Sequence, residues 1–328
     1  MKKRTIGIVV IFIILIIAVI AYQIYSPHNV TQESTVIRIG YKPNSGYQHF
    51  FIAQEKGYFK KYGLNVEGVT FESTNQMVQA VVNGDLDATA ASSIEVIGLV
   101  EQNSPNLLKI YLTLVFDKDH AFHSVLVPPD SKIQTLADLK GKKIGTVPGS
   151  TSQSWLEIIL GRFFDSKKDV QIIQLEPRLQ LQALSSGQVD ALYTVDPIVA
   201  QAQAKGLARV LIKGPENEYM FTPMATGGAV VSQRLVQNNP EAAKNLIRAM
   251  NDAVDFMRTN DSESRQIIAK DTKLEANVAA KLDLLQLWKI NETDLSGVQK
   301  YLDFLAETKI LTKRIAAEDI YLNRSFIQ

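Results

Sequence analysis

The sequence contains two copies of one short pattern about a hundred residues apart. Residues 79–88 read QAVVNGDLDA and residues 182–191 read QALSSGQVDA, an offset of 103. The match continues outside this pattern, because the Ile-Gly pair at 39–40 aligns with the Ile-Gly pair at 144–145 at an offset of 105. A unit this long, present twice, predicts two similar lobes rather than a solenoid, whose repeats run to roughly 20–50 residues. Two lobes predict a cleft between them.

Length and composition agree with two lobes. The chain has 328 residues, more than the roughly 250–300 at which a single hydrophobic core usually stops growing. Its 35 basic and 34 acidic residues lack the charge excess of a nucleic-acid-binding protein, so we expect no nucleic-acid partner. Because cysteine is absent, the chain has no disulfide framework, thiol nucleophile, cysteine zinc site or lipid-modified lipobox cysteine.

The N-terminus has the layout of an export signal. Three basic residues at positions 2–4 precede an uncharged apolar run over 6–21. That run is shorter than the roughly 20 residues of a comfortable membrane span and slightly long for the apolar part of a signal peptide. Residues 1–21 are therefore predicted as a cleaved signal peptide or as an uncleaved membrane anchor, followed by a polar linker over 22–34. Either way the body is exported, to the periplasm or the outer face of the cytoplasmic membrane.

Hydrophobic periodicity predicts the same order of elements in each copy: strand, helix, strand, helix, strand. Strands that alternate with helices build parallel sheets with right-handed crossovers. The sequence thus predicts an α/β fold with two similar lobes, each a mostly parallel sheet flanked by helices. The predicted elements cover 36–41, 47–59, 64–71, 75–83 and 86–91 in the first copy, and 143–147, 155–164, 170–175, 179–186 and 189–194 in the second.

Residues typical of helix N-termini follow four of the strands. Ser45, Ser92 and Ser150 each have Gln or Glu three residues later, which is the capping-box pattern, and Asp196 precedes a proline suited to the first helical position. Parallel sheets bind ligands at the carboxyl ends of their strands, where free backbone N–H groups of the next helix favour an oxyanion such as sulfonate, carboxylate or nitrate. An ordinary capping role is the alternative for each of these residues.

The turn PGSTS at 148–152 is the strongest of these candidates. Gly149 permits close approach of the backbone to a ligand. Ser150, Thr151 and Ser152 place three hydroxyl groups around one helix start. We therefore expect this turn to contact the ligand.

Several motifs, taken together, resemble a family of periplasmic solute-binding proteins. They are IRIGY at 37–41, GYF at 57–59 with GLNVE at 63–67, NGDLDA at 83–88, and TLADLKGKKIGTVPGS at 135–150 followed by SGQVDALYTVDP at 186–197. The combination is similar to the binding proteins for aliphatic sulfonates, taurine, nitrate and thiamine-precursor pyrimidines. The resemblance covers residues 36–233.

This resemblance implies a periplasmic binding protein fold of type II with a two-segment hinge. The chain would leave lobe 1 near 121–127 and return near 227–231, and C-terminal helices such as 240–257 would complete lobe 1. It also implies a monomer that delivers its ligand to the permease subunits of an ABC importer. The implied division is 35–122 for the first part of lobe 1, 123–226 for lobe 2 and 227–328 for the rest of lobe 1.

Other residues are weaker candidates. Tyr41, Tyr47, His49 and Phe122 are suited to packing against an organic ligand or, equally, to the core. Lys42 and Arg178 follow matching strands and would add positive charge to an anion site, or lie in solvent. The predicted ligand contacts are Tyr41, Ser45, Gly46, Ser92, Ser93, Gly149, Ser150, Thr151, Ser152, Arg178 and Asp196.

No metal, cofactor or catalytic residue is predicted. His120 and His123 have HxxH spacing but no third ligand fixed nearby, so they are expected to be ordinary hinge residues. Neither Gly-rich phosphate-binding pattern occurs, and no motif places a Ser, His and Asp set.

Binding of a sulfonate-like organic anion between the lobes is therefore the preferred function. A pyrimidine or nitrate ligand and a membrane-anchored sensory ectodomain are the alternatives. The resembled superfamily also includes a pyrimidine synthase with a cysteine-rich iron motif, which the absence of cysteine disfavours.

Overall fold

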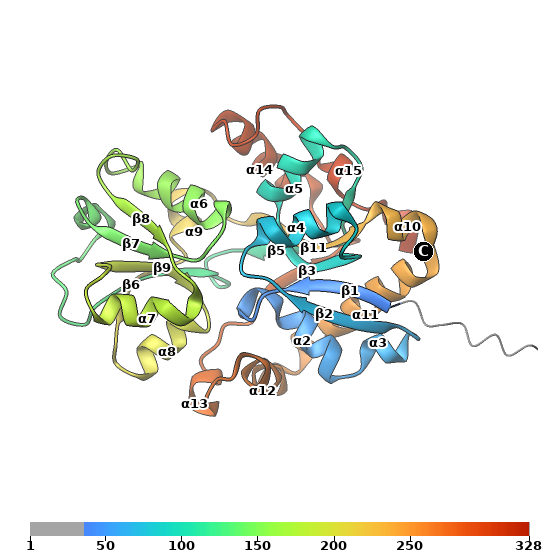
Figure 1. Cartoon of the computed structure of the whole chain (residues 1–328), viewed down its shortest axis with the longest axis horizontal. Coiled ribbons are helices and arrows are strands. Elements are labelled where there is room, and N and C mark those ends of the chain that lie inside the picture. Colours follow the sequence, from blue (N-terminus) through green and yellow to red (C-terminus); the bar gives the residue numbers. More distant parts are fainter. Residues whose placement is uncertain (1–35, 328) are drawn as a thin grey trace, which may run out of the picture. The chain divides into compact units, whose positions relative to one another are not determined.

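The computed structural model describes residues 36–327, apart from the side chain at position 276 (Figure 1). The predicted signal or anchor segment at 1–21 and the linker at 22–34 lie outside the described residues. Within 36–327, none of the helices combines the length and the apolar character that a membrane span requires.

Two separate sheets form the two lobes (Figure 1). The sheet of lobe 1 consists of β1 (Val36–Tyr41), β2 (Asn65–Thr70), β3 (Ala88–Ser93), β4 (Leu108–Ile110), β5 (Leu112–Phe116), β11 (Met224–Ser232) and β12 (Gln286–Lys289). Its order is β12-β5-β11-β3-β1-β2, with β4 also beside β11. The sheet of lobe 2, in the order β10-β6-β9-β7-β8, consists of β6 (His123–Val127), β7 (Lys143–Thr146), β8 (Gln171–Gln174), β9 (Ala191–Val195) and β10 (Arg209–Lys213).

Helices cover both faces of each sheet. In lobe 1 they are η1 (Ser45–Tyr47), α2 (Gln48–Glu55), α3 (Tyr58–Lys61), α4 (Thr74–Asn83), α5 (Ile94–Asn103), α10 (Gln233–Asn238), α11 (Pro240–Thr259), α12 (Asp261–Thr272), α13 (Ala276–Ala279), α14 (Leu295–Glu307), α15 (Ala317–Ile320) and η3 (Arg324–Ile327). Those of lobe 2 are η2 (Leu136–Leu139), α6 (Ser150–Leu160), α7 (Pro177–Ser185) and α8 (Ile198–Ala204), and α9 (Pro215–Tyr219) lies between β10 and β11. Right-handed crossovers place α2 and α4 on opposite faces of their sheet (Figure 1).

The sequence repeat corresponds to a repeated structural unit. β1 pairs in parallel with β2 and β3, and β7 pairs in parallel with β8 and β9. The aligned residues even share a register, because Ile39 lies opposite Ala88 and Ile144 lies opposite Ala191. The prediction of two similar α/β lobes is confirmed.

Two Asp residues explain part of the repeated pattern. The Asp87 carboxylate accepts a hydrogen bond from the backbone N–H of Arg38 at 2.9 Å, and the Asp190 carboxylate accepts one from Lys143 at 2.8 Å. Each Asp therefore satisfies a backbone donor at the start of the central parallel strand of its lobe. The Asp-Ala pair therefore recurs because its Asp has the same structural role in both lobes.

Parallel pairing holds within the repeats but not outside them, so the sheets are mixed rather than mostly parallel. β11 is antiparallel to β3, β4 and β5, and β12 is antiparallel to β5. In lobe 2, β6 is antiparallel to β9 and β10. Of the strands in these antiparallel pairs, only β3 and β9 belong to the repeat, and the repeated pattern carried no information on the direction of the others.

The helix predicted over 47–59 is two helices, because Gly57 adopts a left-handed conformation with φ of 69° between α2 and α3. The helix predicted over 155–164 begins five residues earlier, at Ser150. Its polar first turn lacks the apolar spacing from which helices are predicted. The helix predicted over 240–257 is confirmed, and its apolar stripe is buried in the core of lobe 1.

The chain crosses between the lobes at 117–122, between β5 and β6, and at 214–223, between β10 and β11. The second crossing precedes the predicted position near 227–231, and residue 226 lies within β11 rather than at the end of lobe 2. The Gly227-Gly228 pair is not a hinge. A Cβ atom at Gly227 would overlap the backbone carbonyl of Ser92, so glycine here permits close approach of two strands.

We expect the substitution Gly227→Ala to lower the free energy of unfolding by about 1–3 kcal/mol or more, because the clash involves backbone that cannot move aside. Gly297→Ala in α14 is the control, since its new Cβ would meet only the end of the Asp294 side chain at 3.1 Å. Urea unfolding of both variants measures the difference. Equal stability of Gly227→Ala and the wild type would contradict this account of β11.

Candidate functional site

A cavity lies between the lobes, at the carboxyl ends of β1, β3 and β7. It encloses about 590 Å³ of empty space, including its opening to solvent. Its lining comes from both sheets and from the first turn of α6, as the crevice rule for parallel sheets predicts. The lining residues are Lys42, Asn44, Gly46, Tyr47, Thr74, Ala91, Ser92, Ser93, Leu114, Phe116, Phe122, His123, Val147, Thr151, Ser152, Trp155, Val195 and Thr226.

Five of the predicted ligand contacts line this cavity: Gly46, Ser92, Ser93, Thr151 and Ser152. Three come from lobe 1 and two from lobe 2, so both lobes contribute hydroxyl groups to one cavity. All except Gly46 carry hydroxyl groups, which can donate a hydrogen bond to an anion.

Gly149 and Ser150 lie instead in a neighbouring polar groove. Their backbone N–H groups already donate to protein side chains, that of Gly149 to Gln174 at 3.1 Å and that of Ser150 to Asn75 at 3.3 Å. Asn75 belongs to lobe 1, so Ser150 contributes to contact between the lobes.

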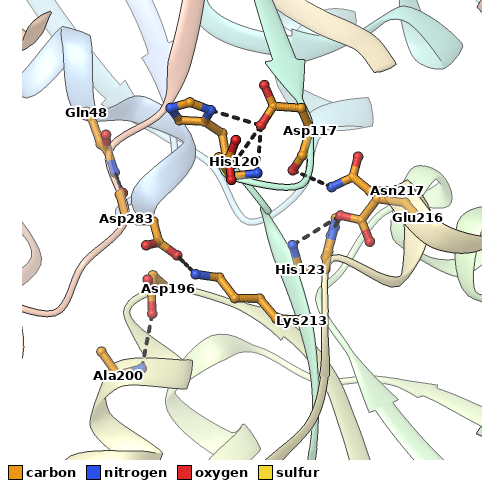
Figure 2. Close-up of polar contacts among 11 residues, drawn as sticks. Gln48, Asp117, His120, His123, Asp196, Ala200, Lys213, Glu216, Asn217 and Asp283 are labelled. Carbon is orange, nitrogen blue, oxygen red and sulfur yellow. Dashed lines mark hydrogen bonds and ion pairs between the residues drawn. The ribbon is translucent and has the colours of Figure 1, made fainter. Parts of the chain in front are cut away.

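Ser45 and Asp196 line a third groove, near the crossing segments. They also join the lobes, because the backbone N–H of Ser45 donates to the backbone carbonyl of Asp196 at 3.0 Å. Burial raises the pKa of the Asp196 carboxyl to about 6. Its Oδ1 accepts from the N–H of Ala200 in the first turn of α8 at 3.0 Å (Figure 2), although Pro197 rather than Asp196 occupies the N-cap position.

Tyr41 and Arg178 lie away from the cavity, contrary to their prediction as ligand contacts. The ring of Tyr41 packs against Phe50 and Phe51, with ring centres 4.8 and 5.8 Å apart. Arg178 is exposed and forms an ion pair with Glu176 at 2.7 Å. A strand end or helix start fixes the backbone position of a residue but not the direction of its side chain.

The predicted capping residues are each displaced by one position. Asn44 rather than Ser45 caps η1, and Ser93 rather than Ser92 caps α5. Ser92 instead forms a hydroxyl pair with Thr89 at 2.8 Å. The N-cap position of α6 is occupied by Gly149, which has no side chain to cap with.

Lys42 is the only lysine or arginine among the described residues that line the cavity. Its ammonium group donates to the hydroxyl of Thr74 at 3.3 Å. Burial lowers the pKa of Lys42 to about 8, and the nearby Glu72 carboxylate opposes part of that shift. The cavity therefore holds one positive charge that an anion would stabilise.

A buried polar chain reaches the cavity from lobe 2. The Nε2 atom of His123 lies 3.1 Å from the Ser152 hydroxyl, and its Nδ1 atom lies 3.3 Å from Oε1 of Glu216. His123 is 3% exposed and Glu216 is 0% exposed. Sequence reasoning missed this chain, because Glu216 is 93 residues from His123 and only the fold brings them together.

The HxxH spacing does not bring the two imidazoles to one ion. His120 Nδ1 pairs with Asp117 at 2.9 Å, whereas His123 faces Glu216 (Figure 2). In the part of the chain that the structure describes, no group of three His, Cys, Asp or Glu side chains is placed to hold a metal ion.

Aromatic rings, here called the aromatic wall, form another part of the cavity lining. Phe122 stacks on Phe116 with ring centres 4.8 Å apart, and Trp155 meets Phe116 edge to face at 6.0 Å. Phe122 and Tyr47 line the cavity, which is one of the two roles expected for them. His49 has the other role: it is buried in the core, bonded to the carbonyl of Ala90 at 2.7 Å, and burial lowers its pKa to about 4.

Direct contacts hold the lobes together around the cavity. The hydroxyls of Ser93 and Thr151 lie 2.7 Å apart, and the Ser154 hydroxyl donates to Glu95 at 3.3 Å. Burial raises the pKa of the Glu95 carboxyl to about 7, although hydrogen bonds from α6 oppose the shift. These contacts join α5 of lobe 1 to α6 of lobe 2 and define a closed arrangement.

Known proteins share this architecture. The "Putative aliphatic sulfonates-binding protein" of Bacillus subtilis (strain 168) is 27% identical over 300 residues, which cover 89% of this chain and 87% of that protein. The solved structure of the periplasmic aliphatic sulphonate binding protein SsuA from Escherichia coli superposes with a TM-score of 0.68 at 22% identity, covering 89% of this chain and 99% of that one. The desulfurization enzyme DszB shares the fold at a TM-score of 0.61 and 17% identity, covering 89% and 97%.

The family model agrees with this architecture. The model of the NMT1-like family matches residues 30–272, which contain both copies of the repeat and every predicted ligand contact. Because the match spans most of the sequence, the chain belongs to the NMT1-like family.

Proposed function

We propose that this protein captures a small organic anion with a sulfonate-like head group between its lobes. The observation that carries the proposal is the composition of the cavity: one partly buried ammonium group, several hydroxyls and an aromatic wall line it together. Lys42, Ser92 and Thr151 suit the oxygen atoms of the head group, and Phe122 and Trp155 suit its organic body.

The relatives support the same ligand class, since both the Bacillus subtilis protein and SsuA carry aliphatic sulfonates in their names. Nitrate would leave the aromatic wall without a partner. A neutral pyrimidine would use that wall but would leave the partly buried charge of Lys42 without an ionic partner from the ligand. An organic anion satisfies both features.

We propose further that the protein is exported and delivers its ligand to the permease subunits of an ABC importer. The basic and apolar N-terminal segment supports export. Closure of two lobes over a ligand gives a transporter a shape that differs between the empty and loaded protein. The same N-terminal segment, if uncleaved, would keep the protein at the outer face of the membrane.

The charge of Lys42 gives a prediction on pH. Lys42→Met should weaken binding of benzenesulfonate by about 1.5–3 kcal/mol, the usual contribution of a charged hydrogen bond. In the wild type, affinity should fall as pH rises through about 8, because the free protein loses the ammonium proton there. Isothermal titration calorimetry between pH 6.5 and 9.5 measures both effects. Lys205→Met, at an exposed site, is the control, and unchanged affinity of Lys42→Met would remove Lys42 from the site.

We propose that the protein binds without turnover, although Ser152, His123 and Glu216 have the order of a nucleophile, base and orienting carboxylate. Acyl transfer also needs free donors for an oxyanion, and the N–H groups of Gly149 and Ser150 are already engaged. We expect a fluorophosphonate probe to leave Ser152 unlabelled, as judged by mass spectrometry of the intact protein. Stoichiometric labelling that Ser152→Ala abolishes would indicate an enzyme.

Ligand binding should bring the lobes together. The Ser93 to Thr151 and Glu95 to Ser154 contacts each join the two lobes, so they form only in the closed arrangement. Small-angle X-ray scattering with saturating benzenesulfonate should give a smaller radius of gyration than without it. An identical profile, with binding established by calorimetry, would contradict delivery by lobe closure.

A further inference from the structure

The hydroxyl of Ser152 is connected to a carboxylate that lies outside the ligand cavity. The connection runs from Ser152 Oγ to His123 Nε2 at 3.1 Å, and from His123 Nδ1 to Glu216 Oε1 at 3.3 Å. The imidazole is held between stacked and edge-on aromatic rings, with the ring centre of Tyr193 at 4.4 Å. Its orientation is therefore fixed, and only its protonation state is free to change.

The contacts of Glu216 are those of an ionised carboxylate. Besides the His123 ring, it accepts from the backbone N–H of His123 at 3.2 Å and from the Tyr193 hydroxyl at 3.4 Å. No lysine or arginine within 36–327 forms an ion pair with Glu216, which is fully buried. A buried carboxylate favours a positive charge on the basic group in contact with it, so Glu216 lowers the cost of protonating the imidazole when an anion binds.

The charge of the imidazole decides what Ser152 offers to a ligand. A neutral His123 that donates from Nδ1 to Glu216 has a lone pair on Nε2, which accepts the Ser152 hydroxyl proton. Ser152 then presents only lone pairs to the cavity. A protonated His123 donates from Nε2 to the Ser152 oxygen, so the hydroxyl proton is free to point at the ligand. An anion needs the second arrangement.

We propose that His123 and Glu216 are positioning residues that make Ser152 a hydrogen-bond donor when the imidazole is protonated, so that the protein takes up a proton together with its anion. The inference rests on the proposed function, because it concerns the same cavity. It adds a basis for specificity: a sulfonate, whose oxygens carry charge, gains more from the donating hydroxyl than a neutral molecule of the same shape does. Anion binding and imidazole protonation would then be coupled reciprocally.

Other titratable groups surround this chain and must be separated from it. Tyr193 contacts Glu216, and Lys42 and Tyr47 line the same cavity. Glu95 contacts Ser154 on α6, the helix that carries Ser152. Because burial lowers the pKa of Lys42 to about 8, most of the uptake by Lys42 occurs above pH 7. A signal from the imidazole itself removes the ambiguity.

Nitrogen NMR of protein with ¹⁵N-labelled histidine provides that signal. The sequence has four histidines, and the resonance missing from His123→Gln identifies the relevant one. On saturation with benzenesulfonate, both ring nitrogens of His123 should show the shifts of the protonated form, and its titration midpoint should rise by about 0.5 pH unit or more. Methyl phenyl sulfone, a neutral analogue of similar shape and a weaker acceptor, should raise the midpoint less than benzenesulfonate does.

A His123 titration that is unchanged by saturating benzenesulfonate would overturn the inference while leaving the proposed function intact. Failure of the wild type to bind any of benzenesulfonate, ethanesulfonate and taurine would overturn the proposed function, and this inference with it. The two failures are distinguished by calorimetry on the same samples.

Glu216→Gln keeps the size of the side chain and removes its charge. We expect roughly tenfold weaker binding of benzenesulfonate at pH 6.5 and loss of the linked shift at His123, with a smaller loss of sulfone binding. His120→Gln is the matched control, because His120 pairs with Asp117 and does not line the cavity. If Glu216→Gln does not fold, the titration of wild-type His123 decides alone. Normal affinity and a normal linked shift in folded Glu216→Gln would exclude a positioning role for Glu216.

Discussion

The contact between the two crossing segments is the constraint on which the relation of the lobes depends. The side-chain amide of Asn217 donates to the backbone carbonyl of Asp117 at 2.7 Å, and Glu216 meets His123 one step away (Figure 2). The two crossing segments are therefore bonded to each other and should move as one hinge. His123 also lines the cavity, so the hinge and the cavity share a residue. A change in the charge of His123 would therefore act on both.

The repeat was sufficient to predict the paired lobes, because the residues that recur are those that every such unit needs. Asp87 and Asp190 accept hydrogen bonds from equivalent backbone N–H groups in their lobes. A shift of register between the strands would break both hydrogen bonds. The second crossing was misplaced for a related reason. A glycine pair in a sequence is compatible with a flexible joint and with strands in close approach, and Gly227 serves the latter. Local sequence does not distinguish them.

Prediction of the site was limited in the same way. Thr151 and Ser152 were found because a glycine and neighbouring hydroxyls at a helix start are visible along the chain. The pairing of His123 with Glu216 was not, since it depends on the distance between elements far apart in sequence. The prediction for Arg178 was wrong for a different reason. Its strand ends at the expected edge of the sheet, but its side chain lies in solvent and pairs with Glu176.

Trp155 is an intrinsic fluorescence probe of whether the lobes are open or closed. Its indole N–H, on α6 of lobe 2, donates to the hydroxyl of Tyr301 on α14 of lobe 1 at 2.7 Å, and the indole is 2% exposed. Opening the lobes must break this hydrogen bond and expose the indole to water. Since the chain has only two tryptophans, the emission of one indole can follow the approach and separation of the lobes in unlabelled protein, on the time scale of the motion itself.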